Sequence, residues 1–372
     1  MEKERILFVA TTTAHINTFH IPYLKWFKEQ GYEVHVASKG SQKIEYCDKH
    51  FDIPFERFPI KKNNLKAYKE LKRIINENNY KIIHCHTPVG GFLTRLAARK
   101  SRKKETRVIY TAHGFHFYKG APLLNWIIYY PLEKWMAHYT DCLITINKED
   151  YEIAKKKLKV KQVEFVHGVG MNTQRFNTMI TEDDKKNKRK GLGIKEDDIV
   201  FTYVAELNKN KNQIMLIQVI EKLKEEYKNI KLLLVGNCNN KQVYQEEIEK
   251  RNLENEVYLL GRRVDIQEIL AITNIYLASS IREGLPVNIM EAMYMGLPII
   301  ATDNRGHREL VNNNENGFII KTKQDMIYRI KEIIENQELR EKMKKNNIEY
   351  IKKYTLKIVI NDMEKIYKEV LN

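Results

Sequence analysis

Apolar runs of strand length, separated by helical patterns, recur along this 372-residue chain and constrain its fold more than any other feature. In the first half these runs are ILFVATT, EVHVAS, KIIHCH, RVIYTAH, CLITIN and VEFVHG. The second half repeats the alternation with IVFTYVAE, IKLLLVGN, VYLLGR, IYLASS, LPIIAT and GFII. Continuous apolar strands between helices are typical of parallel sheets that helices cover on both faces. The sequence therefore predicts an α/β protein with two doubly wound, parallel-sheet, Rossmann-like domains.

A polar, charged stretch without an apolar period, residues 171–198, separates the two sets of runs and suits an interdomain connection. We therefore predict an N-terminal domain over residues 1–175 and a C-terminal domain over residues 176–353. The last segment, residues 354–372, has an amphipathic helical pattern with no strand after it. Because the apolar stripe of such a helix must be covered, we expect it to pack back on the N-terminal domain.

Positive charge is concentrated in the first half of the chain. Of the formal net charge of +16, residues 1–180 hold 31 Lys and Arg against 17 Asp and Glu, whereas the remaining residues hold 33 against 31. This asymmetry fits an anionic partner of the first half, either nucleic acid or a membrane, and it equally fits the solvated faces of a lysine-rich protein. No zinc-finger, helix-turn-helix or aromatic-rich RNA-binding pattern appears, so charge is the only support for nucleic acid.

The cysteines and the N-terminus indicate a reducing compartment. The apolar run at the N-terminus is too short for a signal-peptide core, and no stretch approaches the roughly 20 apolar residues that cross a bilayer. The four cysteines have no paired spacing, which disfavours both a disulfide framework and a structural zinc site. They are Cys47, Cys85, Cys142 and Cys238. We therefore expect a cytoplasmic protein.

The most informative stretch is residues 279–298, which lies between two predicted strands. Pro286 suits the first position of a helix and Gly296 the position just past its end, which predicts a helix from Pro286 to residue 295. The free N–H groups and the dipole at the start of this helix form a ready phosphate site. Glu283 and Glu291 would then accept hydrogen bonds from ribose or sugar hydroxyls. By pattern alone, they could also be a helix-start acid and a solvated face.

This spacing, Glu-x7-Glu followed by AMYMGLPIIATDNRGHRELV, resembles the nucleotide-sugar motif of the family 4 glycosyltransferases, which have the GT-B fold. The segments TAHGFHFYKGAPLLNW, DCLITINKEDYEIAK, VHGVGMNTQRF, AELNKNKN and LLGRRVDIQEIL follow in the order of that family. Only residues 176–198 and 312–372 lie outside the resemblance, which is to a bacterial branch that builds capsular or extracellular polysaccharide on a lipid carrier. It implies two domains facing a cleft, the first binding the acceptor and the second the nucleotide sugar.

The resemblance implies catalytic roles for three residues. Lys211 would neutralise the diphosphate leaving group, His113 would contact the donor sugar and stabilise the reacting centre, and Glu283, the hydroxyl acceptor, is the third. The family usually adds an arginine after a glycine, but this chain has Ala205 and Glu206 there, so a phosphate contact at position 206 is not expected. Without the resemblance, Lys211 could be a solvated helix-start charge and His113 a strand-end cap.

Binding residues are implied on loops of both halves. On the acceptor side, Thr13 and His15 follow the first strand, where many relatives carry two glycines. Small threonines could still admit an acceptor, and His15 is as readily structural as functional. The nucleotide-sugar contacts that we expect in the second half are Gly284, Leu285, Val287, Asn288, Glu291, Arg262, Val264, Asn237 and Ser280.

No metal ion and no other cofactor is expected. The chain contains no Asp-x-Asp, the element with which many metal-dependent sugar transferases hold a divalent ion. The run His84-Cys85-His86 has the residue types of a metal site. Neighbouring residues of a strand point to opposite faces, however, so His84 and Cys85 are not expected to converge.

The resemblance therefore implies a retaining glycosyltransferase, hexosyl or N-acetylhexosaminyl, that moves a sugar from a nucleotide donor, expected to be a UDP-sugar, to a glycan on a polyprenyl diphosphate. The expected partners are the nucleotide sugar, the polyprenyl-diphosphate-linked acceptor and an anionic membrane surface, without nucleic acid. The basic first half would hold the enzyme at the inner face of the cell membrane. A nucleotide-sugar epimerase or hydrolase on the same fold is the alternative. The lack of Gly-x-Gly-x-x-Gly after the first strand argues against a dinucleotide dehydrogenase.

Overall fold

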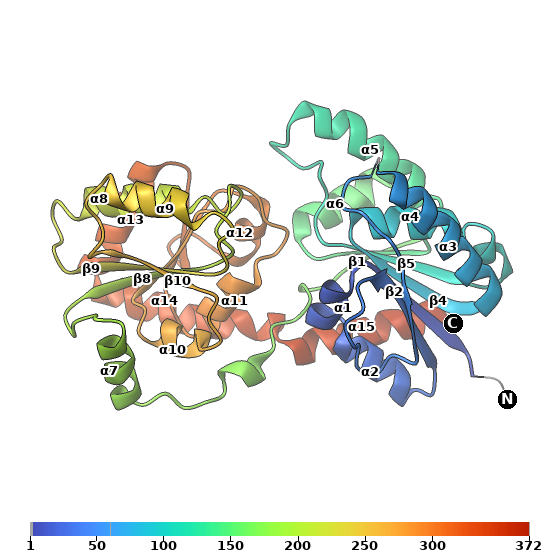
Figure 1. Cartoon of the computed structure of the whole chain (residues 1–372), viewed down its shortest axis with the longest axis horizontal. Helices are drawn as coiled ribbons and strands as arrows, with labels where there is room; N and C mark the ends of the chain where they lie inside the picture. Colours follow the sequence, from blue (N-terminus) through green and yellow to red (C-terminus); the bar gives the residue numbers. More distant parts are fainter. Residues whose placement is uncertain (1–2, 60, 372) are drawn as a thin grey trace. The chain divides into compact units, whose positions relative to one another are not determined.

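The computed structural model describes residues 3–59 and 61–371 of the chain. It divides into two compact units (Figure 1): unit 1 comprises Met1–Gly170 and Leu356–Asn372, and unit 2 comprises Met171–Thr355. The chain leaves unit 1 at 170/171, compared with the predicted 175/176, and returns to it at 355/356, compared with the predicted 353/354.

Unit 1 contains a seven-stranded sheet whose pairings are all parallel. The strands lie in the order β3-β2-β1-β4-β5-β6-β7, so the chain direction across the sheet reverses between β1 and β4. In open sheets of this type, the loops at the carboxyl ends of the strands at such a switch point form the ligand site. The strands are β1 (Arg5–Thr12), β2 (Glu33–Lys39), β3 (Lys49–Asp52), β4 (Tyr80–His86), β5 (Arg107–Ala112), β6 (Cys142–Thr145) and β7 (Gln162–Phe165).

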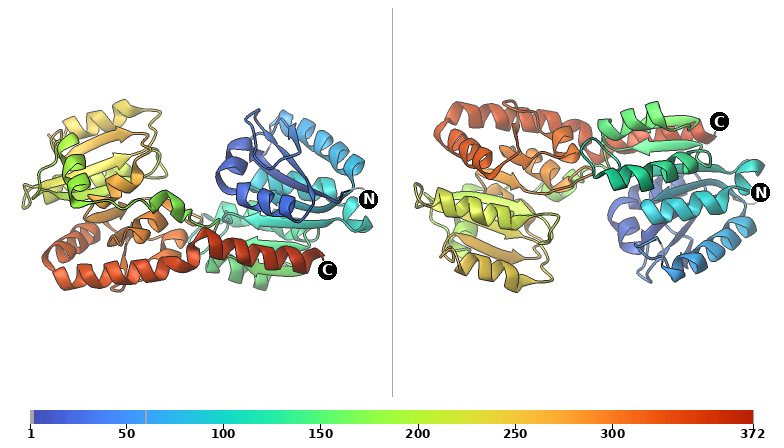
Figure 2. Two further views of the ribbon diagram at one scale, coloured as in Figure 1. Left: turned by 90° about the horizontal axis from the view of Figure 1, so that it is seen from below. Right: turned by 90° about the horizontal axis from the view of Figure 1, so that it is seen from above.

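Helices cover both faces of this sheet (Figures 1 and 2). One face carries α3 and α4, and the other carries α1, α2 and α15. The helical elements of unit 1 are α1 (Thr13–Phe19), α2 (Ile21–Glu29), α3 (Lys62–Asn78), α4 (Pro88–Ala98), η1 (Ser101–Lys104), α5 (Leu123–Ala137), α6 (Lys148–Lys157) and α15 (Leu356–Leu371).

The C-terminal helix α15 is part of the core of unit 1. Its Tyr367 ring packs against Trp26 and Phe27 of α2, with ring centroids 5.5 and 4.6 Å away. The Tyr367 hydroxyl also bonds the Nδ1 atom of the buried His84 at 2.8 Å. A buried tyrosine normally finds such a polar partner for its hydroxyl. The last element of the chain thus packs against elements formed by its first 90 residues.

Unit 2 contains a six-stranded, all-parallel sheet in the order β10-β9-β8-β11-β12-β13. Its switch point lies between β8 and β11. The strands are β8 (Ile199–Val204), β9 (Ile230–Val235), β10 (Val257–Gly261), β11 (Ile275–Ala278), β12 (Ile299–Thr302) and β13 (Gly317–Ile320). The helical elements are η2 (Thr173–Phe176), α7 (Glu182–Gly191), α8 (Gln213–Leu223), α9 (Lys241–Glu249), α10 (Ile266–Ala271), α11 (Val287–Tyr294), α12 (Arg305–Leu310), α13 (Lys323–Glu335), α14 (Gln337–Tyr350) and η3 (Ile351–Tyr354).

The predicted fold class is therefore confirmed: each unit is a doubly wound α/β domain with a parallel sheet. Every predicted apolar run forms a strand, and one further strand, β3, was not predicted. Its sequence, KHFD, is half exposed at the edge of the sheet and has no apolar run. Edge strands lack the burial on both faces that produces such runs in central strands.

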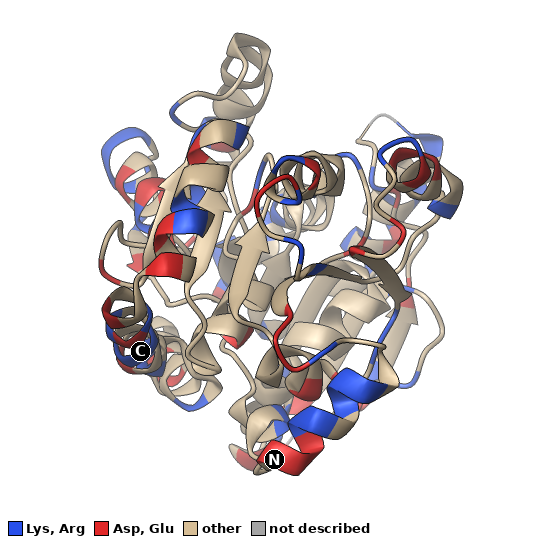
Figure 3. Ribbon diagram, turned by 90° about the vertical axis from the view of Figure 1, so that its left-hand side faces the viewer, with Lys and Arg blue, Asp and Glu red and all other residues tan. Residues whose placement is uncertain are grey.

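Charged side chains lie mainly on helices and loops, where acidic and basic residues are interspersed (Figure 3). The six strands of unit 2 contain a single charged residue, Lys231. Within residues 3–59 and 61–371, no helix is both long enough and apolar enough to cross a membrane.

Candidate active site

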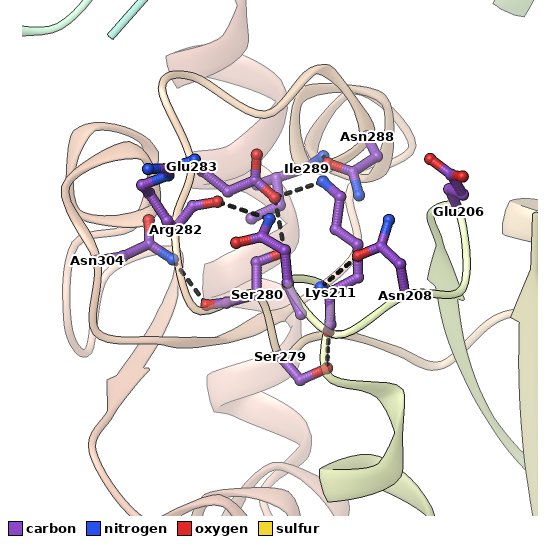
Figure 4. A network of polar contacts seen from close by, with 12 residues as sticks. Glu206, Asn208, Lys211, Ser279, Ser280, Arg282, Glu283, Asn288, Ile289 and Asn304 are labelled. Atoms are coloured by element: carbon purple, nitrogen blue, oxygen red, sulfur yellow. Dashed lines mark hydrogen bonds and ion pairs between the residues drawn. The ribbon is translucent and has the colours of Figure 1, made fainter. Parts of the chain in front are cut away.

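The polar residues of the Glu-x7-Glu stretch lie at the switch point of unit 2, where the loops after β8 and β11 meet (Figure 4). Lys211, in the loop after β8, forms an ion pair with Glu283, in the loop after β11. The Ser280 hydroxyl donates to the same Glu283 oxygen at 2.6 Å, and the buried Tyr203 hydroxyl lies 2.6 Å from the Ser280 oxygen. Three of the residues predicted for this site, Lys211, Glu283 and Ser280, are thus brought together.

Hydrogen bonds to the backbone fix the two loops relative to each other. The Ser279 hydroxyl donates to the carbonyl oxygen of Lys211 at 2.7 Å, and the Ile281 N–H donates to the carbonyl oxygen of Asn210 at 2.8 Å. The Asn210 side chain in turn donates to the Arg282 carbonyl oxygen at 3.1 Å. The position of the lysine backbone is therefore determined by the loop that carries its carboxylate partner.

Helix α11 begins beside this ion pair. It starts at Val287, one position later than predicted, and its N-cap residue Pro286 makes no side-chain cap bond. Of the first-turn N–H groups, that of Ile289 donates to the Asn288 side-chain oxygen at 3.0 Å. The Asn288 amide donates to the carbonyl oxygen of Val204 at 2.7 Å, which ties the helix to the end of β8. At the other end, Gly296 has a φ of +72° just past the last helical turn, as the sequence predicted. The backbone N–H groups of Val287 and Asn288 are therefore the donors that an anion beside Lys211 would meet at this helix end.

Glu291 lies in α11 with its carboxyl almost wholly buried, at 8% exposure. This burial raises the pKa of its carboxyl, and an ion pair with Arg175, 3.6 Å away, opposes that rise. A buried carboxylate with one distant cationic partner still has acceptor capacity for ligand hydroxyls.

The other residues predicted for the nucleotide sugar lie on loops that follow neighbouring strands. Gly284 and Leu285, half buried, connect the ion pair to α11. Asn237 follows β9 and is exposed, and Arg262 and Val264 follow β10, where the Val264 side chain is 91% exposed. The carboxyl ends of parallel strands lie at one edge of the sheet, so all of these loops belong to the edge that carries Lys211.

Glu206 occupies the position at which the resemblance to the family 4 glycosyltransferases would place an arginine. Its side chain is exposed, and Figure 4 shows it on the far side of Asn208 from Glu283. Its carbonyl oxygen accepts a hydrogen bond from the buried Gln213 amide at 3.0 Å. The preceding Ala205 makes a close backbone contact: a Cβ atom on Gly236, whose φ is +156°, would lie 2.0 Å from the Ala205 oxygen. This part of the loop is therefore fixed by its backbone.

Sequence reasoning missed a second layer of residues that support the loop after β11. Thr302 and Asn304, at the end of β12, both donate to the carbonyl oxygen of Ser280, at 2.6 and 2.9 Å. Arg305 donates to the carbonyl oxygen of Glu283 at 3.3 Å. Burial lowers the pKa of His307 to about 4, so this ring is neutral, and its Nδ1 donates to the Thr302 carbonyl oxygen at 2.7 Å. These residues belong to the quoted TDNRGHREL run, and the adjacency of β12 and β11 is the signal that could have indicated them.

In unit 1, His113 directly follows β5, as predicted, and it lies against His15 with ring centroids 4.9 Å apart. The structure adds His20 and His86 to this group: one ring nitrogen from each of the four lies within 4.8 Å of the others. The run His84-Cys85-His86 was not expected to form a metal site, because His84 and Cys85 point to opposite faces of the sheet. That argument holds for Cys85, but residues from other elements surround His86 instead. Burial lowers the pKa of His113 to about 3 and that of His15 to about 4.

The loop that carries His113 is held by α6. The Phe115 N–H donates to an Asp150 carboxylate oxygen at 3.0 Å, and the Asn147 amide donates to that same oxygen at 2.9 Å. Asn147 is also the N-cap of α6 and accepts from the Asp150 N–H at 2.8 Å. The segment DCLITINKED thus positions the TAHGF loop, and His116 of this loop stacks on Tyr129 of α5.

Thr13, predicted on the acceptor side, is fully buried at the start of α1. Its hydroxyl lies 2.9 Å from both the Ser38 hydroxyl and the Gly40 carbonyl oxygen. Thr13 therefore ties the end of β1 to the end of β2.

Two doubly wound α/β units, one with an ammonium, two carboxylates and a helix N-terminus at its switch point, define the class of the GT-B glycosyltransferases. Comparison with known proteins agrees: the family model described as glycosyl transferases group 1 matches residues 184–350, and that described as glycosyl transferase 4-like matches residues 5–147. The EpsD protein of Bacillus subtilis (strain 168), which carries a glycosyltransferase name, is 43% identical over 372 residues, which are 99% of this chain and 97% of that protein. The chain belongs to this family and is a glycosyltransferase.

Two further proteins resemble the chain. The UDP-Gal:alpha-D-GlcNAc-diphosphoundecaprenol alpha-1,3-galactosyltransferase of Escherichia coli is 32% identical over 265 residues, covering 69% of this chain and 67% of the enzyme. The crystal structure of Anabaena Alr3699/HepE in complex with UDP and glucose has a TM-score of 0.79 at 17% identity, covering 98% of this chain and all of that one, and thus shares the fold. The predicted family and enzyme class are confirmed, and the epimerase or hydrolase alternative is not favoured.

Proposed function

We propose that this glycosyltransferase moves a sugar, with retention of configuration, from a UDP-sugar to a glycan on a polyprenyl diphosphate during synthesis of a cell-surface polysaccharide. The observation that carries the donor half of this proposal is the Lys211–Glu283 pair beside the start of α11. The acceptor half is supported by the Escherichia coli relative, whose name specifies both a UDP-sugar and a diphosphoundecaprenol-linked acceptor.

Lys211 is suited to stabilise a diphosphate leaving group. An ammonium has three N–H donors, and the carboxylate of Glu283 uses one of them, which leaves two for phosphate oxygens. Negative charge on the diphosphate grows as the bond from the sugar to oxygen breaks, so a fixed ammonium binds the transition state more tightly than the ground state. Glu283 holds the ammonium in place, and its second oxygen is available to a sugar hydroxyl.

The N-terminus of α11 supplies the second contact to the diphosphate, through Gly284, Leu285, Val287 and Asn288. Glu291, one turn further along the helix, accepts hydrogen bonds from the ribose hydroxyls. The ammonium and the helix dipole together do the work of a divalent ion, so we propose that transfer is independent of metal.

The nucleotide base would lie over the loops after β9 and β10. Val264 offers an exposed apolar surface there, and Asn237 and Arg262 offer hydrogen-bond donors. The transferred sugar is assigned to His113, whose neutral imidazole can accept a hydrogen bond from a hydroxyl. His15, beside it, is assigned to the acceptor.

A lipid-linked acceptor requires contact with an anionic membrane surface, and α5 has the composition for such contact. Its exposed side chains include large apolar ones: Leu123, Leu124, Ile127, Ile128 and Trp135. Basic residues lie close by, since Arg102 of the basic element η1 donates to the carbonyl oxygen at His138, the C-cap of α5. An apolar helix face bordered by cations is typical of proteins that bind at the bilayer interface.

The test of this function is a panel of nucleotide sugars offered with a synthetic polyprenyl-diphosphate-linked glycan, scored by release of the nucleotide. We expect release with a UDP-sugar only when the acceptor is present, an α-linked product, and the same rate in EDTA. Release without acceptor would indicate a hydrolase, and inactivity in EDTA would contradict the metal-independent mechanism. The Lys209→Ala variant, which changes an exposed lysine of the same loop, serves as the control for loss of Lys211.

A further inference from the structure

Four histidines from four places in the sequence converge at the switch point of unit 1. His15 lies on α1, His20 joins α1 to α2, His86 ends β4, and His113 follows β5. One ring nitrogen of each lies within 4.8 Å of those of the other three. The His20 and His86 rings are stacked with centroids 3.8 Å apart.

Six of the eight ring nitrogens of this histidine cluster lack hydrogen-bond partners among the described residues. Within the described residues, both ring nitrogens of His20 and of His86, and the Nε2 atoms of His15 and His113, are buried without a hydrogen bond. His20 and His86 are only 2% and 1% exposed. Buried polar atoms are normally paired, so six unpaired nitrogens in one place indicate that another group binds there.

Two other buried histidines of the same unit, His84 and His35, have hydrogen-bond partners for both ring nitrogens. His84, two residues from His86 on the same strand, bonds the Tyr367 hydroxyl through Nδ1 and the Thr111 hydroxyl through Nε2, both at 2.8 Å. His35 bonds the Tyr80 hydroxyl at 2.7 Å and a Glu33 carboxylate at 2.8 Å. Both ring nitrogens of these two buried histidines are therefore paired, in contrast to those of His20 and His86.

We propose that His15, His20, His86 and His113 form a binding site for a divalent late first-row transition metal, with Zn²⁺ the best match. Neutral imidazole is a preferred ligand of zinc, copper and nickel, and the set contains no carboxylate that would favour calcium or magnesium. Burial keeps these rings neutral, as lowered pKa values of about 4 for His15 and about 3 for His113 indicate, so their lone pairs are available without loss of a proton.

The site requires a small contraction on binding. Tetrahedral zinc with Zn–N bonds of 2.0–2.1 Å places its ligand nitrogens about 3.3 Å apart, closer than the 4.8 Å limit of the cluster. Two ligands lie at the ends of strands in the centre of the sheet, and two lie on α1 and its junction with α2. Ring rotation and a small shift of α1 toward the strands would close the cluster, so zinc would link α1 to the sheet.

This site shares a residue with the transfer reaction, and that consequence rests on the proposed function. His113 is assigned to the transferred sugar, and an imidazole nitrogen bound to zinc cannot also accept a hydrogen bond from a sugar hydroxyl. Zinc therefore inhibits transfer while it stabilises unit 1.

The test titrates the full chain, without a histidine tag, with Zn²⁺ in competition with a chromophoric chelator. We expect one equivalent to bind, a rise in the thermal unfolding temperature, and a tetrahedral visible spectrum when Co²⁺ replaces Zn²⁺. His20→Gln and, separately, the less buried His15→Gln should each weaken binding by about tenfold or more. His138→Gln, which alters an exposed histidine outside the cluster, is the matched control and should bind as the unmodified chain does.

Equal zinc binding by His15→Gln, His20→Gln and the unmodified chain would overturn the proposal, as would the absence of stoichiometric binding. Circular dichroism establishes that each variant is folded before it is titrated, and two variants at different positions guard against the failure of one. Binding is measured without donor or acceptor, so it stands or falls separately from transferase activity. In an active preparation, transfer that continues unchanged in saturating Zn²⁺ would exclude competition for His113.

Discussion

At the switch point of unit 2, the loops after β8 and β11 carry charged side chains that are paired with each other, as Lys211 and Glu283 are. At the switch point of unit 1, the loops around β1, β4 and β5 carry four neutral imidazoles, six of whose ring nitrogens make no hydrogen bond among the described residues. Both positions follow from the same strand order, so the fold places a site there but does not choose its chemistry. In unit 2, the charged side chains hold each other in position without a ligand. In unit 1, the histidine ring nitrogens are available to a ligand.

The largest effect is expected from Lys211→Ala. This variant removes the ammonium that the loop after β8 contributes to the network in Figure 4. Loss of a fixed donor to the leaving group should cost about 2–4 kcal/mol of transition-state stabilisation, measured as a fall in kcat/KM. The Lys209→Ala control should retain activity. Unchanged turnover in Lys211→Ala would mean that the charged pair of unit 2 is structural.

Glu283→Gln tests whether the carboxylate acts through the lysine. The neutral amide no longer fixes the ammonium, so we expect a loss of about 1–3 kcal/mol, mainly in kcat. If Glu283 works only by positioning Lys211, the double variant Lys211→Ala, Glu283→Gln should be no slower than Lys211→Ala alone. Additive losses would instead indicate a separate contact of Glu283 with the sugar.

Acid should destabilise unit 1 more than unit 2. A buried histidine with a lowered pKa binds no proton in the native state, whereas the unfolded chain takes one up below its ordinary pKa of about 6.5. The free energy of unfolding is therefore unaffected above about pH 6.5 and falls as pH drops toward about 4, by at most about 1.4 kcal/mol per pH unit for each such group. Unit 1 has five of these histidines among the described residues, and unit 2 has His307. The five are His15, His20, His84, His86 and His113.

Tryptophan fluorescence measures this difference directly, because all three tryptophans of the chain, Trp26, Trp126 and Trp135, lie in unit 1. The fluorescence melting temperature should fall between about pH 7 and about pH 5, and His20→Gln should make that fall shallower. A melting temperature that is independent of pH in this range would contradict neutral burial of the cluster.

Glu291→Gln is expected to have a smaller effect, on binding of the nucleotide. The amide keeps one acceptor for the ribose and loses the charge, so the affinity for UDP should fall by about 1 kcal/mol. Burial already raises the pKa of this carboxyl, so the neutral side chain should not destabilise unit 2. Calorimetric titration with UDP provides the measurement, with the exposed Glu315→Gln as the control. Unaltered affinity would remove Glu291 from the nucleotide site.

The last prediction compares the surfaces of the two units. Leu124→Glu on α5 should weaken binding to vesicles with anionic lipid several-fold, because it places a carboxylate in an exposed apolar face. Met179→Glu, at a residue of unit 2 that is 88% exposed, should leave binding unchanged. Flotation at low and high salt measures both. Equal binding to neutral and anionic vesicles would show that charge does not contribute.

Local patterns predicted most of the fold. Buried parallel strands impose continuous apolar runs, so the strands of both sheets were visible in the sequence except the half-exposed β3. The helix at residues 287–294 was predicted within one or two residues, because proline and glycine mark its ends. The crossing at 170/171 was placed too late, since the Met171 N–H donates to the Tyr354 carbonyl oxygen at 2.8 Å and pairs distant parts of the chain.

The two sites were predicted less completely than the fold, because their residues are distant in the sequence and meet only through the order of the strands. Lys211 and Glu283 were each identified from their motifs, but their pairing across 72 residues depends on the adjacency of β8 and β11. The histidine cluster has no local pattern at all, because its members are contributed by α1, the α1–α2 junction, β4 and the loop after β5. Only the strand order brings them together, and no run of residues specifies that order.

The packing of α15 has a consequence for how the chain is made. Residues 1–170 leave the ribosome first, but Tyr367, whose ring packs on Trp26 and Phe27, is synthesised only after all of unit 2. Domains usually fold in order as they emerge. Here the α2 face of unit 1 stays uncovered until all of unit 2 has been translated, because α15 follows unit 2 in the sequence. A stop codon within α15 would therefore destabilise the beginning of the protein, which this helix covers.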